Sequence, residues 1–344
     1  MRRQRIVCMI SLCIVMLAGC SGVEVPSSDR TQTSGTGAEE TKQTAEIFAM
    51  NTIMNLTVYG EEASQLLKEA RALIQTYEER LSVNVETSDV AKLNRAGGQP
   101  VQVSEETYEL IQKSMAISEQ TDGIFDISIY PLVRAWGFTE EEYRVPSEEE
   151  RQKIAGSVDY RQIQLREDHT VVMPEQMQID LGGIAKGYVS DKLMELFRDR
   201  GAKAAVVSLG GNVQTYGTKP DGTPFTVGIT DPADGESMLG TIEVGQTAVI
   251  TSGSYQRYFE KDGVRYHHIM DKKTGAPAES DLTSVTVLCE HGDMADSIAT
   301  AMFVMGKERA IAFEREHDDI SCILIDKNGG IWMSEGIHLK LIKS

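Results

Sequence analysis

Cysteine is scarce in this chain of 344 residues, which has five of them. Cys8 and Cys13 lie in an apolar N-terminal run that ends at Cys20, so only Cys289 and Cys322 remain for the rest of the chain. These two occupy apolar stretches, VTVLCE and ISCILI, which are typical of buried strands. The pattern favours two buried thiols on neighbouring strands over a disulfide between them. It also excludes a small fold held together by a disulfide framework.

Basic side chains are also few, because 34 lysines and arginines face 52 acidic residues and the net charge is −18 at pH 7. Removal of the first 19 residues takes away three arginines and leaves 31 basic residues against the same 52 acidic ones. An acidic surface excludes nucleic acid and anionic lipid as the main partner. A phosphate ligand would therefore need local help from a lysine, a helix N-terminus or a metal ion.

Internal repeats are absent, and no linker-like stretch interrupts the chain after residue 45. Residues 46–344 are enough for one large α+β domain. Apolar periodicity predicts helices over residues 61–81 and 105–120, the second capped by Ser104, and strands over residues 53–59, 204–209, 225–230 and 247–251.

The N-terminus has the composition of a targeting segment. Residues 1–19 run from a basic start through an uncharged apolar stretch to Leu-Ala-Gly, which predicts a signal peptide that is too short to span a membrane. The small residues before Cys20 resemble the lipobox of bacterial lipoproteins, in which this cysteine is lipidated; a chance cysteine is the alternative. Residues 20–45 are rich in Ser, Thr, Gly, Gln and Glu and predict a flexible tether. We expect an exported protein, lipid-anchored to the cell membrane and facing the periplasm or the cell exterior.

A glycine-rich stretch at residues 179–187, IDLGGIAKG, is followed by an apolar rhythm that predicts a helix ending at Gly201. Gly182 and Gly183 allow a ligand to approach the backbone, and the helix start and Lys186 favour an anion. The spacing matches neither G-x-x-x-x-G-K-[ST] nor G-x-G-x-x-G. A phosphate-handling turn and a purely structural tight turn both remain open.

Three further stretches contain residues suited to chemistry. Residues 121–138, TDGIFDISIYPLVRAWGF, predict a loop with short elements that forms either a ligand wall or a cover over the core. His267 and His268 are neighbours on a predicted strand, so they point to opposite faces and cannot bind one metal ion together. Either histidine suits acid–base chemistry, and a structural histidine is the alternative.

Asp296 and Thr300 stand four residues apart in a predicted helix and therefore share a face. A carboxylate and a hydroxyl are hard oxygen ligands that suit Mg²⁺ and do not suit zinc. On spacing alone, a helix-start acid and an ordinary packing threonine explain the pair better than a metal site does.

The motifs taken together resemble those of the FAD:protein FMN transferases, the ApbE family. The stretches that carry the resemblance occur in the family's order: MNTIM, LSVNVETSDVAKLN, TDGIFDISIYPLVRAWGF, IDLGGIAKGYVSD, LGGN, TSGSY, HHIMDKKTG and ADSIATAMFVMG. They extend from Met50 to the C-terminus. The resemblance implies a single α+β domain with a mixed, largely antiparallel sheet and packed helices.

The resemblance also implies an activity, in which the FMN half of FAD moves to a Thr or Ser hydroxyl of a flavoprotein and AMP is released. The acceptor would be a flavoprotein, expected in a membrane redox complex. The metal, usually Mg²⁺, would be held by the Gly183 carbonyl, Asp296 and Thr300, with Ala299 close by. FAD contacts carry over to Met50, Asn84, Ile124, Phe125, Asp126, Asp180, Lys186, His268 and Ile269.

Two positions depart from the family pattern. Many members have glycine where this chain has Asn51, and tyrosine near the flavin or adenine wall where it has Asn84. The second departure keeps Mg²⁺-dependent FAD hydrolysis open as an alternative, and a non-catalytic flavin-binding lipoprotein is the third. For transfer, we expect His268 to take the proton of the incoming hydroxyl, with Asp180 as the rival base.

Overall fold

The computed structural model describes residues 42–140 and 142–342. The predicted signal peptide (residues 1–19), the lipidation site Cys20 and residues 20–41 of the predicted tether lie outside the described residues. Strand β1 (Lys42–Ala49) includes residues 42–45, which were predicted as tether. The prediction of a tether over residues 42–45 was wrong because β1 pairs with β2 (Thr52–Tyr59) along its whole length. The hydrogen bonds between paired strands come from the backbone, so polar side chains do not prevent them.

The main sheet has eight antiparallel strands in the order β1-β2-β6-β7-β10-β15-β16-β17. Its other members are β6 (Ala204–Leu209), β7 (Asn212–Gly217), β10 (Ala248–Gly253), β15 (Leu282–Cys289), β16 (Ser321–Asp326) and β17 (Ile331–Met333). The central strands are buried on both faces: every residue of β6 is buried. This explains why AAVVSL has no polar alternation.

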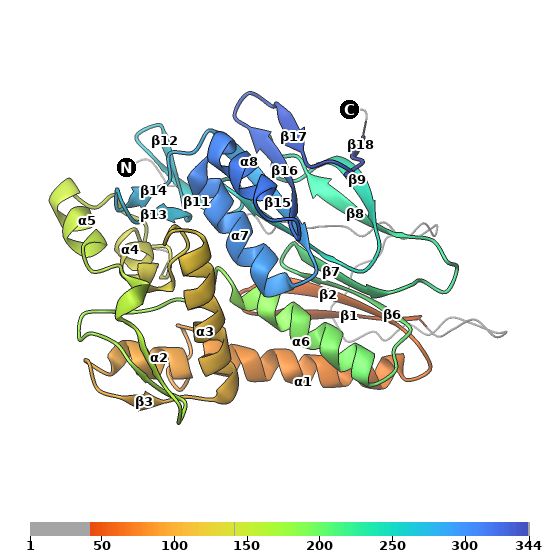
Figure 1. Ribbon diagram of the computed structural model, residues 1–344, viewed down its shortest axis with the longest axis horizontal. Coiled ribbons are helices and arrows are strands. Elements are labelled where there is room, and N and C mark those ends of the chain that lie inside the picture. Colours follow the sequence, from red (N-terminus) through yellow and green to blue (C-terminus); the bar gives the residue numbers. More distant parts are fainter. Residues whose placement is uncertain (1–41, 141, 343–344) are drawn as a thin grey trace.

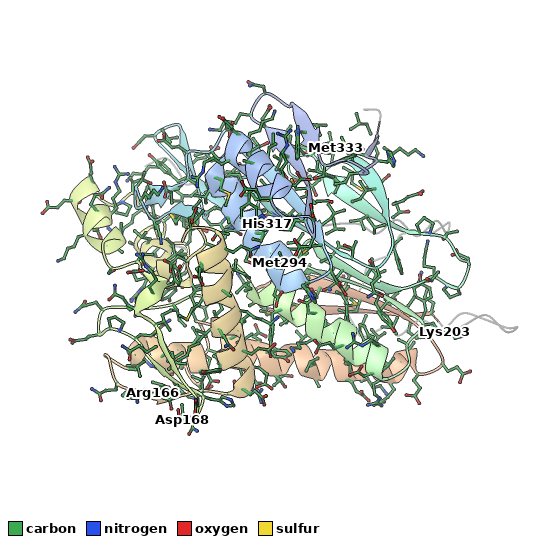
Figure 2. All side chains as sticks on the ribbon, viewed as in Figure 1. Arg166, Asp168, Lys203, Met294, His317 and Met333 are labelled. Atoms are coloured by element: carbon green, nitrogen blue, oxygen red, sulfur yellow. The ribbon has the colours of Figure 1, made fainter. Side chains whose placement is uncertain are left out.

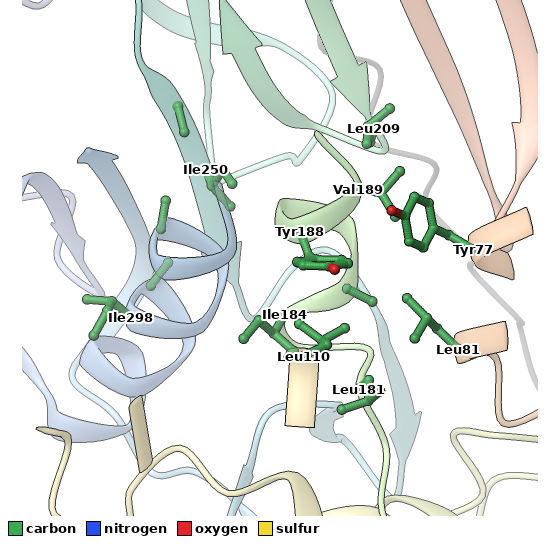
Figure 3. Close-up of a cluster of buried hydrophobic side chains, with 14 of the residues drawn as sticks. Tyr77, Leu81, Leu110, Leu181, Ile184, Tyr188, Val189, Leu209, Ile250 and Ile298 are labelled. Atoms are coloured by element: carbon green, nitrogen blue, oxygen red, sulfur yellow. The ribbon is translucent and has the colours of Figure 1, made fainter. Parts of the chain in front are cut away.

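Four helices pack along one face of this sheet, as Figure 1 shows. They are α1 (Ala63–Leu81), α6 (Ala185–Asp199), α7 (Gly292–Met305) and α8 (Lys307–Arg315). A fifth helix, α3 (Glu105–Gln120), packs against α7. Figure 3 shows the core between them, where Tyr77 of α1 meets the ring of Tyr188 of α6 edge-on at 5.6 Å. The predicted apolar face of residues 61–81 is thus the buried one.

A small sheet covers the opposite face of the main sheet. It consists of β8 (Phe225–Thr230), β9 (Met238–Val244) and β18 (Lys340–Leu341). β8 alternates buried and half-buried residues, and its buried members Phe225, Val227 and Ile229 pack on Val213 and Val249 of the main sheet. The main sheet therefore separates two apolar layers.

The remaining elements are short and connect the layers. They are α2 (Asp89–Arg95), β3 (Val101–Gln102), η1 (Ile127–Ile129), α4 (Tyr130–Ala135), α5 (Glu148–Ala155), η2 (Tyr160–Gln162), β4 (Gln164–Arg166), β5 (Thr170–Val172), β11 (Tyr258–Lys261), β12 (Val264–His267), β13 (Met270–Asp271) and β14 (Ala276–Pro277). In Figure 2, Arg166 and Asp168 mark the turn between β4 and β5 at one extremity of the molecule.

The aromatic stretch at residues 121–138 forms η1 and α4, as its punctuation predicted, and supplies a separate aromatic cluster. Trp136 and Phe138 are buried against Phe259 and Tyr266 of the β11–β12 hairpin. The Trp136 indole donates a hydrogen bond of 2.9 Å to the Gly275 carbonyl. The cluster fastens this loop to residues more than a hundred positions later in the chain.

Ser104 caps α3, as the sequence predicted, since its hydroxyl accepts a hydrogen bond from the Thr107 amide. The same hydroxyl donates to the buried Asp89 carboxylate at 2.7 Å. We expect Ser104→Ala to lower the free energy of unfolding by about 1–2 kcal/mol, because it removes both interactions. Urea denaturation measures this. Ser147→Ala is the control: it removes the cap of α5, a helix with no buried residue, and should cost less.

Cys289 and Cys322 are free, buried thiols on the neighbouring strands β15 and β16. Burial raises the pKa of each to about 12, so both stay protonated. The expectation of two buried thiols is confirmed. Within residues 42–140 and 142–342, none of the helices combines the length and apolarity needed to cross a membrane.

Candidate active site

A cleft of about 410 Å³ opens where the β1–β2 and β6–β7 turns and the end of β10 meet the helix layer. The segment before η1, the turn before α6, residues 268–270 and α7 complete its walls. Most of the predicted site residues line it: Met50, Ile124, Phe125, Asp126, Asp180, Gly183, Lys186, His268, Ile269, Asp296 and Thr300. Segments up to 250 residues apart in sequence thus converge on one cavity of the size that small-molecule sites have.

The β1–β2 turn enters the cleft with a strained backbone. Met50 and Asn51, its two central residues, both have positive φ, at 49° and 59°. Glu78 of α1 accepts a hydrogen bond of 2.8 Å from the Met50 amide and holds this conformation. Non-glycine residues in this region are uncommon and concentrate at functional sites.

The turn before α6 places Asp180 in the cleft. Its amide donates to the Ile127 carbonyl at 2.8 Å, and its carboxylate accepts the Gly182 amide at 2.8 Å. Burial raises the pKa of this carboxyl, while the Gly182 amide, Arg257 and Lys186 act in the opposite direction. The raised pKa makes this carboxylate a stronger base than an ordinary aspartate, which suits a group that handles protons.

Helices α6 and α7 cross at two glycines. A Cβ on Gly187 would lie 2.0 Å from the Gly292 carbonyl oxygen, and one on Gly292 would lie 2.5 Å from the Gly187 oxygen. Only glycine permits this approach. As a result the Gly187 amide donates a 3.1 Å hydrogen bond to Oδ2 of Asp296, across the helix pair.

This bond redirects the first turn of α6. In a regular helix the Gly187 amide would bond to the Gly183 carbonyl. Here the neighbouring amides of Ala185 and Tyr188 follow that pattern, but the amide of Gly187 bonds to Asp296. The Gly183 carbonyl is thus left without its helical partner and remains available to a ligand.

Oxygen atoms of three kinds are therefore present where a metal ion was predicted. Asp296 is 4% exposed, and its Oδ1 has no hydrogen-bond donor among the described residues. Thr300 lines the same wall, where its hydroxyl is 3.1 Å from that of Ser252. Together with the Gly183 carbonyl, these donors are the hard oxygens that Mg²⁺ prefers, so the residues fit such an ion. In the part of the chain that the structure describes, no three His, Cys, Asp or Glu side chains cluster as a metal site.

Lys186 supplies positive charge at this point. Its ammonium lies 3.6 Å from Asp296 Oδ2 and 3.3 Å from the Gly182 carbonyl oxygen. The amides of Ala185 and Gly187 are already bonded, to the Leu181 carbonyl and to Asp296, so the amide of Lys186 is the one at the start of α6 that can face an anion. A diphosphate in the cleft would meet both.

Asp191 fixes the start of α7 relative to α6. Its carboxylate accepts the amides of Gly292 and Asp293 at 2.7 and 3.0 Å, and the Gln214 side-chain amide at 2.7 Å. Lys113 of α3 neutralises Asp293 at 2.7 Å. These contacts hold the helix that carries Asp296 in a fixed register.

His268 stands on the opposite wall. The Arg257 carbonyl accepts from its Nδ1 at 3.1 Å, so Nδ1 carries the proton and Nε2 keeps a lone pair. Burial, then the nearby His267 and Arg257, lower the pKa of His268 to about 3, which leaves the ring neutral near pH 7. His267 points to the other face, where its ring meets Phe303 edge-on, as the alternation of a strand predicted.

The Asp126 carboxylate is occupied by protein partners. It is fully buried, pairs with Lys272 at 2.9 Å, and accepts from the Ser128 amide and hydroxyl and from the Tyr160 amide. It therefore holds the wall of the cleft together, with little capacity left for a ligand. Any contact with FAD would come from its backbone.

Comparison with known proteins identifies the family of this chain. A family model described as the ApbE family matches residues 50–324. The chain belongs to the ApbE family. It is 34% identical over 311 residues to the FAD:protein FMN transferase of Treponema pallidum (strain Nichols), covering 84% of this chain and 86% of that protein. It is 36% identical over 272 residues to one from Klebsiella pneumoniae (strain 342), covering 78% and 84%.

Solved ApbE structures share the fold. The ApbE protein of Thermotoga maritima MSB8 superposes with a TM-score of 0.81 at 34% identity, covering 86% of this chain and 97% of that one. The flavin transferase ApbE from Vibrio cholerae has a TM-score of 0.76 at 27% identity, covering 87% and 97%. The predicted α+β architecture is therefore confirmed.

Two residues taken from the ApbE resemblance do not line the cleft. Asn84 is exposed in the loop after α1, where its amide bonds to the Ser82 hydroxyl, and Ser88 closes that loop by donating to the Ser82 carbonyl. Ala299 is fully buried in α7 and offers only a backbone carbonyl. The contacts that the resemblance implies, between Asn84 and FAD and between the Ala299 carbonyl and the metal ion, stay predictions.

The sequence analysis missed other residues of the ApbE cleft, namely Thr52, Asn212, Ser252, Gln256 and Arg257. Arg257 stands out, because its guanidinium donates to the Phe138 carbonyl and its charge acts on both Asp180 and His268. TSGSY ends two residues before it, but no local pattern distinguishes this arginine from a surface one.

Proposed function

We propose that this chain transfers the FMN moiety of FAD to a Thr or Ser hydroxyl of an acceptor flavoprotein, in a Mg²⁺-dependent reaction that releases AMP. The main support is the convergence in one cleft of Lys186, the uncapped start of α6 and the oxygens of Asp296 and Thr300. ApbE relatives that are named FAD:protein FMN transferase support the same reaction. We further propose that a lipid on Cys20 anchors the protein outside the cell membrane, beside a membrane redox complex that contains the acceptor.

The cleft residues bind and orient the diphosphate. The ammonium and the backbone amide of Lys186 attract its oxygens, and Arg257 adds further positive charge. The Gly183 carbonyl, Asp296 and Thr300 would hold Mg²⁺, which neutralises the charge that develops on the phosphoryl oxygens. Phosphoryl transfer needs such positioning and charge more than covalent chemistry by the protein.

The transfer step balances as a displacement at the FMN phosphorus. The acceptor oxygen forms a bond to that phosphorus, the bond from phosphorus to the bridging oxygen breaks, and AMP leaves with the electron pair. The proton of the acceptor hydroxyl passes to Nε2 of His268, because Nδ1 already donates to the Arg257 carbonyl. Asp180 is the rival acceptor for this proton, since its raised pKa makes it a stronger base than an ordinary aspartate.

We expect His268→Asn to lower kcat by about 10²- to 10⁴-fold, because it removes the proton acceptor. The Kd for FAD, measured by fluorescence quenching, should change much less.

Because the pKa of His268 in the folded protein, about 3, lies below the usual 6.5, the acid limb of kcat/KM in the wild-type protein should lie well below pH 6.5. By the same linkage the unfolded chain binds a proton first as pH falls, so stability should decrease from pH 6.5 downward. A wild-type kcat in the variant would assign the proton to Asp180.

The reaction itself is tested with the full-length chain in detergent, FAD, Mg²⁺ and an envelope protein extract. AMP together with a fluorescent, flavinylated protein band establishes the transferase, and mass spectrometry of that band identifies the modified segment. AMP with free FMN and no labelled protein indicates FAD hydrolysis. FAD binding without either product indicates a flavin-binding lipoprotein.

A further inference from the structure

One edge of β10 lacks a strand partner beside the cleft. β7 pairs with β10 only at Ala248 and Val249, whereas β15 follows the other edge of β10 to Gly253. Beyond Val249, no strand among the described residues pairs with the β7 side of β10. The backbone groups of Thr251 and Gly253 point to this open edge, since alternate residues of a strand bond to the same side.

The carboxamide of Gln256 occupies this open edge. Its Nε2 donates to the Thr251 carbonyl at 2.9 Å, and its Oε1 accepts from the Gly253 amide at 3.2 Å. A carboxamide has the same donor and acceptor as a peptide group. Gln256 thus makes two hydrogen bonds that the backbone N–H and C=O groups of a neighbouring strand would otherwise make.

The edge adjoins the candidate metal site. Thr251, Ser252 and Gln256 all line the cleft, and the Ser252 hydroxyl is 3.1 Å from that of Thr300. The Ser252 side chain therefore points to the α7 face of the sheet. Residues directly opposite one another on paired strands point to the same face, about 5 Å apart. A residue paired opposite Ser252 would direct its side chain toward Thr300 and Asp296.

We propose that an extended segment of the acceptor protein adds to β10 at Thr251–Gly253, displacing the Gln256 carboxamide. The modified Thr or Ser would then stand opposite Ser252, with its hydroxyl facing the reaction site. This role presupposes the FMN transfer proposed above. Strand addition at a sheet edge gains affinity from main-chain hydrogen bonds, so the side chains that flank the modified residue can vary. Only the residues of the segment that face the helices need to be small.

Gln256→Ala tests the displacement, because it removes the competing carboxamide. The probe is a synthetic twelve-residue peptide that covers the segment which the wild-type chain flavinylates in the extract. The KM for this peptide, relative to that for FAD, should fall about five- to tenfold. In the wild-type chain the peptide must break the hydrogen bonds of Gln256, which are worth about 1 kcal/mol net, and in the variant it need not. Gln246→Ala is the matched control, since its carboxamide also accepts a backbone amide, that of Gly217, but outside the cleft. An unchanged or raised ratio in Gln256→Ala would overturn the proposal.

A second measurement covers the case in which Gln256→Ala does not fold. Peptides with single amide-to-ester replacements lose one N–H each. With the wild-type chain, kcat/KM should fall about fivefold or more at alternate positions around the modified residue, the pattern of a paired strand. Equal sensitivity at every position, or none, contradicts strand addition while leaving the transferase intact. If no flavinylated protein appears in the extract, the proposed transferase activity and this docking role are both contradicted.

Discussion

Asp296→Asn should lower kcat/KM for FMN transfer by about a thousandfold or more, since charge stabilisation by a bound metal is worth several kcal/mol. The replacement is isosteric and its amide oxygen can still accept the Gly187 amide, so the α6–α7 crossing should survive. What is lost is the carboxylate among the three proposed metal ligands. Calorimetry should show Mg²⁺ binding weakened in parallel with the rate.

Glu308→Gln is the control for this variant, because it removes one exposed acid at the start of α8. It should leave the rate, Mg²⁺ affinity and stability close to those of the wild type. Wild-type turnover and Mg²⁺ binding in Asp296→Asn would mean that the ion is held elsewhere. Lys186 would then be the main partner of the diphosphate.

Gly187→Ala should cost about 3 kcal/mol or more of folding free energy, since overpacking against backbone cannot be relieved by a rotamer change. The new Cβ would lie 2.0 Å from the Gly292 carbonyl oxygen, so α6 and α7 must separate. Separation also breaks the bond from the Gly187 amide to Asp296. We therefore expect a lower urea midpoint together with weaker Mg²⁺ binding.

Gly245→Ala gives the matched comparison, because a Cβ at Gly245 would meet nothing within 4 Å. Its urea midpoint should stay near that of the wild type. If Gly187→Ala is equally stable, the two helices do not cross as closely as the structure shows. If Gly187→Ala has wild-type stability but no longer binds Mg²⁺, the substitution acts on the metal site alone.

Local patterns predicted the regular elements well. α3, β6 and β8 begin and end where periodicity and capping placed them, because each has a continuous apolar face and a clear start signal. The short strands β11, β13 and β14 were missed, since two to four residues carry too little pattern. β1 was missed because its first residues are polar and gain their order from pairing with β2.

The site was less accessible to such reasoning. The bond between Gly187 and Asp296 joins residues 109 apart, and that between Lys272 and Asp126 joins residues 146 apart. No local period encodes such pairs, so the sequence could flag Gly187 and Asp296 separately but could not join them. That resemblance also supplied Asn84, whose loop is closed by its own serines and lies away from the cleft.

Three glycine amides at the cleft and at the α6–α7 crossing can serve as spectroscopic probes. The backbone amides of Gly182, Gly187 and Gly292 donate to three different carboxylates, those of Asp180, Asp296 and Asp191. Isotope labelling of glycine alone would make these three protons visible by nuclear magnetic resonance. Each signal reports on a separate event: proton uptake at Asp180, cation arrival at Asp296, and the seating of α7 on α6. Occupancy of the site is thus readable atom by atom without any turnover.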